Sequence, residues 1–549
     1  MVSHNSRNHH HPRSPHSYNF WYCIFATANA CLGSMFVTYT LVISGKLIPW
    51  FKNHLFPEEG RFVAVLMVSC TIFTALIGSL IAGKMCLIAG RRLTMIIFDL
   101  IAIAGVIVCL FDSVACIFVG RLLIGFVFGV NNVAAPLYFT EIVPVFFRGA
   151  FANGPTIFGA TGVLIATLLG LLMPSDLPYG DSDDNTWRVL IGLSMVPLIL
   201  RTFNFLAVFR CDTPVYYVHK SEYRKAAKNM KRVMKGDISK RMTEILNERD
   251  YVQSTKGQVK YIDLRKKRFR MAVFVCSVLS ALQYLAGMII ILVYLGEVLD
   301  VGLDGDFTQS AILGVCTAMI NLASALFSIW TTTAFGRRPL VVWGVLGTAF
   351  ILLIYGILAE TVGADSLVSK IWLIFWPIPW NFSLGSIQHL ILAETLPDAG
   401  FAVTSIFHWT FAWLTFQFFP NEVDSMGYGW TFIMYGLITA AGAVFLYFTL
   451  VESRNKNKDE VLMLYSGKEA PARKDIKGME DSHEEAQLQV ERVEREHKEK
   501  LKNKHHDKGR QNHAYEEVIS HHVETQTENG SDLGSGNQIQ MSPEHEIKA

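Results

Sequence analysis

Charged residues are scarce in this chain, and they are unevenly placed. Asp, Glu, Lys and Arg together make up 17% of its 549 residues, whereas hydrophobic residues make up 51%. A soluble protein carries roughly a quarter charged residues. Most of the charge lies in a central stretch and after residue 451, and the long runs between are nearly bare. This composition excludes an ordinary soluble protein and indicates an integral membrane protein.

Cysteine is also missing where a disulfide framework would need it. The nine cysteines lie almost entirely within the apolar runs, where a free Cys behaves as a small buried hydrophobe. We therefore expect no disulfides. No catalytic constellation and no metal-ligand spacing appear either. The expected protein is not an enzyme, binds no cofactor or metal, and has no nucleic-acid partner.

Twelve apolar runs are each long enough to cross the hydrocarbon core of a bilayer, which takes about 20 helical residues. We therefore predict an all-α membrane protein with twelve transmembrane helices embedded in the lipid bilayer. The first run is too long for the core of a signal peptide, so we expect it to stay attached. The runs lie near 18–44, 62–83, 93–112, 114–137, 150–173, 188–209, 271–298, 309–335, 339–362, 370–393, 401–421 and 427–450.

Lys and Arg are dense between the sixth and seventh runs, and they are absent from 174–187, 299–309 and 422–429. Because basic loops stay on the cytoplasmic side, we predict that the central loop and both termini are cytoplasmic. The membrane is either the plasma membrane or that of an internal organelle. The predicted units are a disordered N-terminal segment (1–17), a six-helix bundle (18–209), a cytoplasmic loop with short helices (210–270), a second six-helix bundle (271–450) and a largely disordered, charged cytoplasmic tail (451–549).

Two polar stretches have helical patterns. SEYRKAAKNMKRVM at 221–234 places Tyr223, Ala227, Met230 and Met234 on one face, which predicts a helix with a packed side. Its basic face is either solvated or in contact with anionic lipid. In the tail, EEAQLQVERVEREHKEKLK predicts a charged helix, and the tail is a candidate site for a cytoplasmic partner.

The two halves of the chain share motifs in the same order. AGRRLTM at 89–95 is echoed by FGRRPLV at 335–341, and TEIVP at 140–144 is echoed by AETLP at 393–397. Each half thus places Gly-Arg-Arg after its second apolar run and a Glu shortly before a Pro after its fourth. Two matching pairs at nearly the same offset indicate an internal duplication.

With these motifs, residues 18–455 resemble the major facilitator superfamily and, within it, the sugar-porter branch. The resemblance implies two six-helix bundles, a substrate site between them near the middle of the membrane, and alternating access by rocking of the bundles. The other matching stretches are ISG at 43–45, GRLLIG at 120–125, PLYFTEIVPVFFRGA at 136–150, WR at 187–188, DTPVYY at 212–217 and VESR at 451–454.

In this family, ion pairs at the cytoplasmic ends of the helices close the inner side and break as it opens. Anchoring of the topology alone would explain the arginines but not the acids, because acids contribute little to orientation. Two acids of the family pattern are replaced by Leu87 and Thr333, and the Arg that the family has after AETLP is missing from LPDAGFA. We therefore expect the second-half gate to have fewer partners. The gate residues that the resemblance implies are Arg91, Arg92, Glu141, Arg148 and Asp212 in the first half, with Arg337, Arg338, Glu394 and Glu452 as counterparts in the second.

Several amides that the family uses at its sugar site are replaced here. Alignment on the family motifs puts Thr156, Tyr284 and Trp409 at amide positions. Each buried sugar hydroxyl needs a partner or costs about 1–3 kcal/mol, so a plain hexose is less favoured than the scaffold implies. Pro377 and Pro379 are predicted to break the tenth helix, and helix packing is the alternative role for any single His or Trp. The pocket candidates are Thr156, Gln283, Tyr284, Asn321, Trp380, Gln388, His389 and Trp409.

Energy coupling is predicted from the first helix. Proton-driven sugar porters carry an Asp there that faces an Arg of the fourth helix, whereas FVTYTLVISG at 36–45 places Tyr39 at that position and Arg121 is retained. A carboxylate can take up and release a proton beside an Arg, but Tyr stays neutral at ordinary pH. The resemblance therefore predicts a proton-independent facilitator of a small polar solute, a sugar or polyol-like molecule, in which Tyr39 accepts a hydrogen bond from Arg121.

The departures from the family pattern leave a second function open. A transporter-like nutrient sensor or scaffold, signalling through its cytoplasmic tail, would tolerate an altered pocket and gate. The first-half motifs favour transport instead.

Two charges lie inside predicted helices. Asp99 and Arg201 are each on the order of 10–12 Å from the inner end of their helix, at 1.5 Å per residue. An unpaired charge at that depth costs a few kcal/mol, so we predict that the two side chains pair. The alternative is that each snorkels separately to the inner interface.

Overall fold

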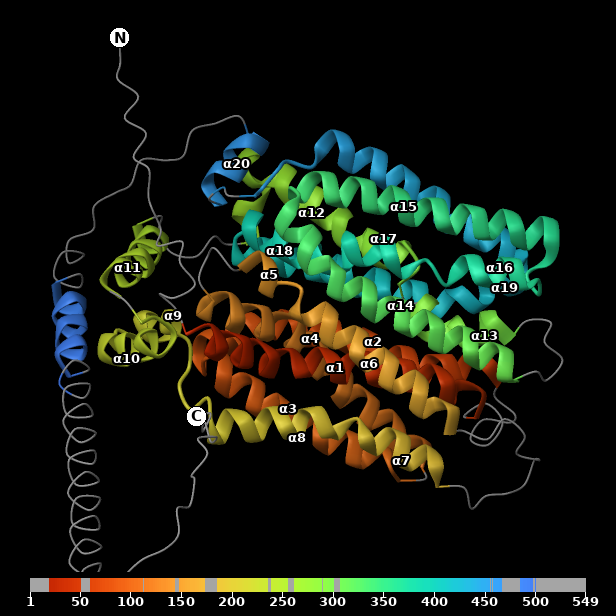
Figure 1. Ribbon diagram of the computed structural model, residues 1–549, viewed down its shortest axis with the longest axis horizontal. Helices are drawn as coiled ribbons and strands as arrows, with labels where there is room; N and C mark the ends of the chain where they lie inside the picture. Colours follow the sequence, from red (N-terminus) through yellow and green to blue (C-terminus); the bar gives the residue numbers. More distant parts are fainter. Residues whose placement is uncertain are drawn as a thin grey trace, which may run out of the picture.

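The computed structural model describes residues 19–50, 60–111, 113–143, 148–172, 185–235, 238–254, 261–288, 290–300, 307–454, 456, 458–466, 484–496 and 499. Every regular element assigned within these ranges is a helix, and the long helices run side by side (Figure 1). Ten helical segments of the described chain are long and apolar enough to cross a membrane. The protein is therefore an all-helical membrane protein. The predicted disordered segment 1–17 lies outside the described residues.

The first half of the chain, red to yellow in Figure 1, packs together as one group of helices. It is built from the first six apolar runs, and its last run is divided into two helices at Ser194. Its elements are α1 (Phe20–Trp50), α2 (Gly60–Ile88), α3 (Arg91–Cys109), α4 (Val114–Ile142), α5 (Arg148–Phe151), α6 (Gly154–Leu169), the 3-10 helix η4 (Gly170–Leu172), α7 (Thr186–Leu193) and α8 (Met195–Ala207).

The second half, green to blue in Figure 1, lies alongside the first, and short helices from the predicted central loop lie at one end of both. The loop helices are α9 (Pro214–His219), α10 (Tyr223–Val233), α11 (Ser239–Ser254) and η5 (Tyr261–Arg265). The second half contains α12 (Lys267–Leu285), the π-helix η6 (Ile290–Tyr294), α13 (Leu295–Asp300), α14 (Phe307–Ala334), α15 (Arg337–Leu358), the π-helix η7 (Ala359–Gly363), α16 (Leu367–Leu373), α17 (Pro377–Phe382), α18 (Leu384–Thr395), α19 (Asp398–Thr449) and α20 (Lys458–Ser466).

Breaks in the second half explain why ten candidates are found where the sequence shows twelve apolar runs. The tenth run is divided into α16, α17 and α18, with Pro377 beginning α17 and Ser383 leaving helical geometry at φ −124° and ψ −95°. The eleventh and twelfth runs join in α19, which is interrupted at Gly427 with φ 78°, a conformation that glycine adopts without steric cost. Discontinuous helices of this kind are tolerated in membranes where they line a cavity.

Small residues allow close packing within the first half. α2 and α4 approach so closely that a Cβ on Gly125 or Gly129 would lie 1.9 Å from the carbonyl oxygens of Thr71 and Ala75. Association of membrane helices depends on such close backbone contact, because lipid is as apolar as the side chains themselves.

A separate hydrophobic cluster holds the short loop helices together. Tyr223, Ala227 and Met230 of α10 are buried in it, and Met234 packs against it, so the predicted packed face is confirmed. Residues 484–496 of the tail form a helix that contributes to the same cluster. The tail residues buried there are Ala486, Val490 and Val493.

The basic face of α10 is covered in part by this tail helix. Arg224 Nη2 lies 2.7 Å from Glu496 Oε1, and Lys231 Nζ lies 3.5 Å from Glu494 Oε1. Lys228 is more distant from Glu496, at 3.9 Å. The face that the sequence leaves to solvent or lipid thus meets acidic residues of the same chain.

We predict that apolar burial, more than surface charge, holds the tail helix in place. Val490→Asp with Val493→Asp puts two carboxylates into the cluster, and burial of unpaired charge is strongly unfavourable. Deuterium uptake across 484–496 should therefore rise to that of a free peptide. Leu488→Asp is the matched control, because Leu488 is 50% exposed on the same helix. Equal protection in all three proteins would contradict the observed packing.

Candidate functional site

A cavity of about 610 Å³ lies between the two halves. From the first half it is lined by α1, α2, α4, α6 and η4, and from the second by α12, η6, α13, α14, α17, α18 and α19. Its volume is within the range of about 300–1,000 Å³ that is typical of small-molecule sites. The broken segments described above form part of its wall, as Trp376, Pro377 and Trp380 all line it.

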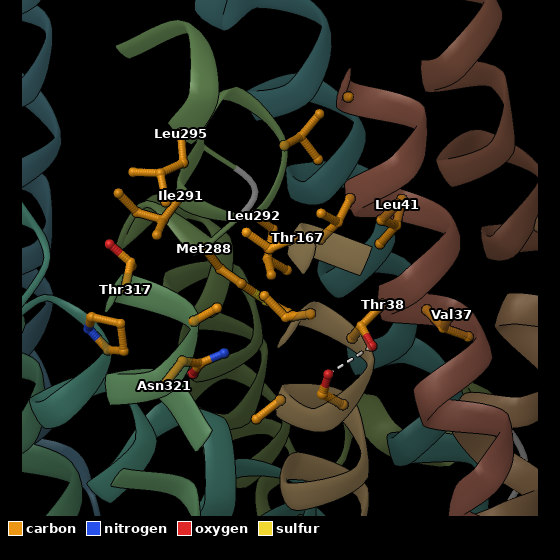
Figure 2. Close-up of a pocket in the computed structure, with 18 of the residues that line it drawn as sticks. Val37, Thr38, Leu41, Thr167, Met288, Ile291, Leu292, Leu295, Thr317 and Asn321 are labelled. Carbon is orange, nitrogen blue, oxygen red and sulfur yellow. Dashed lines mark hydrogen bonds between the residues drawn. The ribbon is translucent and has the colours of Figure 1, made fainter. Parts of the chain in front are cut away.

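Part of the wall is apolar, as Figure 2 shows. Met288 and Leu292 of the second half face Leu41 of α1 across the cavity. Thr38 also faces the cavity, but its hydroxyl already donates a hydrogen bond of 2.8 Å to the carbonyl oxygen of Gly159. Hydrogen bonds to a ligand therefore have to come from other side chains of the wall.

Seven of the eight predicted pocket residues line this cavity: Thr156, Gln283, Tyr284, Asn321, Trp380, His389 and Trp409. The exception is Gln388, which is buried elsewhere in α18 and whose amide has no hydrogen-bond partner among the described residues. On a helix, adjacent residues point about 100° apart, so His389 faces the cavity and Gln388 does not. Trp380 in α17 and His389 in α18 both lie at the cavity wall.

Several polar atoms in this wall lack partners. Among the described residues, the indole nitrogens of Trp380 and Trp409 and the side-chain oxygens of Gln283 and Asn381 are buried without a hydrogen bond. Each such atom costs about 1–3 kcal/mol. Two donors and two acceptors thus belong to side chains that line one cavity, although the atoms themselves are buried, and rotation of these side chains would bring them to a polyhydroxylated ligand.

An aromatic and histidine cluster closes one side of the cavity. The Tyr284 hydroxyl shares a hydrogen bond of 2.9 Å with His408 Nε2. The His408 ring lies 5.6 Å from that of His389 and 5.0 Å from that of Trp409. Sequence reasoning missed His408, as well as Asn131 and Asn132 of α4, although two adjacent amides inside an apolar run are a detectable signal. The other polar wall residues missed include Lys46, Glu297 and Asn381.

At the end of the molecule near α9, the first-half gate residues form one network. Asp212 accepts the backbone N–H groups of Arg91 and Arg92, each at 3.1 Å, and so caps α3. The guanidinium of Arg91 binds Glu141 Oε1 through Nη2 at 2.8 Å and through Nε at 3.0 Å. Thr213 donates to the other oxygen of that carboxylate.

The second half repeats this network position by position. Glu452 accepts the backbone N–H groups of Arg337 and Arg338 at 2.9 and 3.1 Å, and so caps α15. Arg337 Nη2 lies 3.6 Å from Glu394 Oε1, and Ser453 donates to Glu394 Oε2 at 2.7 Å. The sequence duplication is therefore a duplication of contacts.

The second arginine of each motif also has the same role in both halves. Arg92 Nη2 donates to the carbonyl oxygen of Phe205 at 2.7 Å, and Arg338 Nη2 donates to that of Tyr447 at 2.6 Å. Each bond ties the start of one long helix to the end of another.

The contacts above each join residues of the same half. Arg148 begins α5, but its side chain lies outside the described residues. Polar contact between the halves near this end comes from residues that the sequence did not single out. Asn153 at the start of α6 donates to Thr332 Oγ1 at 2.8 Å and accepts from Ser328 Oγ at 3.1 Å.

The two capping carboxylates differ in their proton affinity. Burial raises the pKa of Asp212, and the N–H donors of Thr213 and Arg92 only partly offset this. Burial also acts on Glu452, but there the N–H groups of Arg454 and of Arg337 and Arg338 outweigh it, so the pKa lies below the usual value. Glu452 is thus the more firmly ionised cap.

Arg121 and Tyr39 do not form the hydrogen bond that the sequence predicts, and that prediction was wrong. Both residues line a small cavity of about 10 Å³. The Tyr39 hydroxyl donates to the carbonyl oxygen of Leu190 at 2.8 Å, while Arg121 donates to Ser44 Oγ. Ser44, further along α1, has the hydroxyl that reaches the guanidinium.

The predicted pair of Asp99 and Arg201 is confirmed. Both side chains are almost completely buried, and Arg201 binds both carboxylate oxygens of Asp99, through Nη2 and through Nε at 3.0 Å. Thr202 adds a third hydrogen bond to Asp99, at 3.1 Å.

Two related groups of membrane helices around a shared cavity, with matched charged networks at one end, define a membrane transporter rather than an enzyme. The family described as "Sugar (and other) transporter" matches residues 26–465. The chain belongs to this family, within the sugar-porter branch of the major facilitator superfamily, and it is a multi-pass integral membrane protein.

Relatives and solved structures agree with this assignment. The chain is 25% identical to the facilitated trehalose transporter Tret1 of Apis mellifera ligustica, over 83% of this chain and 90% of that protein. It is 26% identical to facilitated glucose transporter member 3 of Oryctolagus cuniculus, over 83% of this chain and 95% of that protein. The structure of the proton:xylose symporter XylE of E. coli bound to 6-bromo-6-deoxy-D-glucose has a TM-score of 0.71, at 21% identity, covering 82% of this chain and all of XylE.

Loss of the buried Asp99 carboxylate should destabilise the protein strongly. Asp99→Ala leaves Arg201 buried without its counter-charge, and we expect a loss of about 3–5 kcal/mol in the free energy of unfolding. Thermal unfolding in detergent measures the change. Glu491→Ala is the control, because it removes an exposed pair with Arg495 that is worth less than about 1 kcal/mol. Similar losses in the two variants would contradict the structural role of the buried pair.

The cap at Glu452 should make stability depend on pH. A carboxyl whose pKa is lowered on folding stabilises the protein above its unfolded pKa of about 4.3, and this contribution disappears as pH falls through the lower folded pKa. We expect Glu452→Gln to lower the thermal midpoint at neutral pH, with a gap to the wild type that closes as the pH falls below about 4.3. A gap that is constant across this range would contradict the assignment.

Proposed function

We propose that this protein is a facilitator that moves a sugar or polyol-like solute across its membrane by alternating access. In this proposal the chain crosses the membrane twelve times in two bundles of six helices (18–209 and 271–450), with both termini, the loop 210–270 and the tail 451–549 in the cytoplasm. The observation that carries the proposal is the cavity between the halves, whose wall holds unpartnered donors and acceptors.

The polar atoms of the wall are suited to sugar hydroxyls. A hydroxyl both donates and accepts, so it can pair with the indole N–H of Trp380 or Trp409 and with the amide oxygen of Gln283. The aromatic rings beside these groups can stack on the apolar face of a sugar ring. With Thr156 and Tyr284 already hydrogen-bonded within the protein, the indoles replace part of the missing amides.

The gate residues fit a role at the inner side of the transporter. Arg91 and Glu141 in the first half, and Arg337 and Glu394 in the second, hold helix ends together in matching networks. Rearrangement of these pairs, together with loss of the Asn153 contacts between the halves, would accompany opening to the cytoplasm.

The first helix supports proton independence. A tyrosine bonded to a backbone carbonyl stands where proton-driven relatives have a carboxylate, and Arg121 is paired with a neutral hydroxyl. A carboxylate beside an arginine can take up and release a proton, and this pair of residues lacks the carboxylate. Among the relatives, the two transporters from animals are described as facilitated and XylE as a proton symporter.

Transport should be insensitive to a proton gradient. We expect D-glucose, D-xylose or trehalose to equilibrate across proteoliposomes containing the purified protein, at the same rate with and without an imposed pH difference. Exchange of labelled for unlabelled sugar in both directions should follow. Accumulation above equilibrium that collapses with a protonophore would contradict the facilitator assignment.

The indole donors can be tested one at a time. Trp409→Phe keeps an aromatic ring and removes the N–H, so we expect KM for the transported sugar to rise about fivefold to tenfold, the effect of one lost hydrogen bond. Trp343→Phe is the matched control, since Trp343 is 71% exposed on the outside of the bundle. Equal KM values for both variants would exclude Trp409 as a sugar ligand.

A second candidate is a sensor that reports sugar binding through its tail, because the tail helix 484–496 packs on the loop helices. In that case sugar would change the protection of 484–496 without net uptake. Sugar uptake that persists in a chain ending at residue 466 would favour the transporter.

A further inference from the structure

The buried pair of Asp99 and Arg201 is connected to the cavity through Asn131. Asp99 binds Arg201 through Nε and Nη2, and the remaining nitrogen, Nη1, donates to Asn131 Oδ1 at 2.5 Å and to the carbonyl oxygen of Ala30 at 3.1 Å. Asn131 in turn lines the cavity. The network therefore spans α3, α8, α4 and α1 and ends at the cavity wall.

We propose that Asn131 is a specificity-determining hydrogen-bond donor for the solute, and that Asp99 and Arg201 are positioning residues that fix the orientation of its amide. This inference rests on the proposed function of the cavity as a sugar site. It assigns the donor to the first half, opposite the indoles of the second.

The orientation of the amide follows from the chemistry of its partner. A guanidinium group only donates hydrogen bonds, so the Asn131 atom that faces Arg201 has to be the oxygen. Rotation of the amide by half a turn would bring its NH₂ group against the cation and leave Nη1 without this acceptor. Asp99 holds the guanidinium from the other side, which excludes a compensating shift of Arg201.

The NH₂ group of Asn131 is left for the cavity. Oδ1 is engaged by Arg201, and Nδ2 makes no hydrogen bond among the described residues, although it is not one of the buried polar atoms without a partner. It therefore retains contact with the open space of the cavity. A donor fixed in this way selects a ligand with an acceptor, a hydroxyl or ring oxygen, at one position.

The first helix is shaped to allow this arrangement. A Cβ at Gly33 would lie 2.0 Å from both Arg201 Nη1 and Asn131 Oδ1. Only a residue without a side chain can occupy that position while the guanidinium and the amide remain in contact. Gly33 is thus required for the contact between Arg201 and Asn131, and its neighbour Ser34 lines the cavity.

The experiment measures binding of D-glucose and its 2-, 3-, 4- and 6-deoxy analogues to the purified full-length protein in detergent, by calorimetry. Three variants are compared with the wild type. Asn131→Ala removes the donor, and Asn131→Asp removes it while keeping a shape that still pairs with Arg201. Asp99→Asn leaves Asn131 in place and releases the guanidinium. Glu491→Gln, on the exposed face of the tail helix, is the control, and thermal unfolding checks that each protein is folded.

We expect the loss of only one sugar hydroxyl to affect binding through Asn131. One deoxy analogue should bind the wild type about fivefold more weakly than D-glucose, as for a lost neutral hydrogen bond. The two Asn131 variants should bind D-glucose as weakly as that analogue, and should bind the analogue with unchanged affinity. Asp99→Asn should lower the affinity for D-glucose and leave the affinity for that analogue unchanged. A nonspecific structural defect would lower both affinities.

Other outcomes overturn the inference in distinguishable ways. If the variants lower the affinity for D-glucose and for all its deoxy analogues equally, or do not lower it at all, the role of Asn131 is overturned while the sugar site remains. A wild type that binds none of these sugars overturns the hexose site itself, and the donor role of Asn131 with it. If both Asn131 variants retain full selectivity among the analogues, the donor lies elsewhere in the wall.

Discussion

A polar group inside a membrane-spanning bundle has no water to bind, and this constraint organises the protein. Asp99 and Arg201, buried in apolar surroundings, supply each other's counter-charge from two different helices. At the ends of helices, carboxylates accept the free N–H groups, as Asp212 and Glu452 do. Among the described residues, some of the buried polar atoms without partners belong to side chains that line the cavity, those of Gln283, Trp380, Asn381 and Trp409. Because an unpartnered group costs about 1–3 kcal/mol, a ligand that pairs with these atoms of the cavity wall would gain by binding.

The duplicated networks give the two halves the same contacts at the ends of their helices. In each, a carboxylate after the last helix caps the helix that follows Gly-Arg-Arg, and the first arginine holds the Glu that ends another helix. The second-half pair of Arg337 and Glu394 is longer, at 3.6 Å, although the family acid missing at Thr333 does not prevent the network from forming. The halves thus contain matching networks, and the hydrogen bonds that Asn153, Thr156 and Ser69 make across them join neutral groups. Such an interface is suited to rocking.

Much of this could be predicted from the sequence, for identifiable reasons. The apolar runs and repeated motifs predicted the helical membrane fold and its duplication, and burial depth alone predicted the pair of Asp99 and Arg201. The partner of Arg121 could not be predicted, because the choice between Tyr39 and Ser44 depends on which hydroxyl the packed helices bring within reach. Gln388 is one residue from His389, and only the observed rotation of α18 separates them. The role of Asn131 depends on Arg201, which lies 70 residues away, so no local pattern reveals it.

The most direct test of the account is a structure of the protein with a sugar bound. The account predicts a sugar ring in the cavity between the halves, with hydroxyl oxygens within about 3.2 Å of the indole nitrogens of Trp380 or Trp409 and of the amide oxygen of Gln283. The atoms that are unpartnered in the free protein would then be paired. A sugar bound outside this cavity, or one that leaves those atoms without partners, would contradict the account.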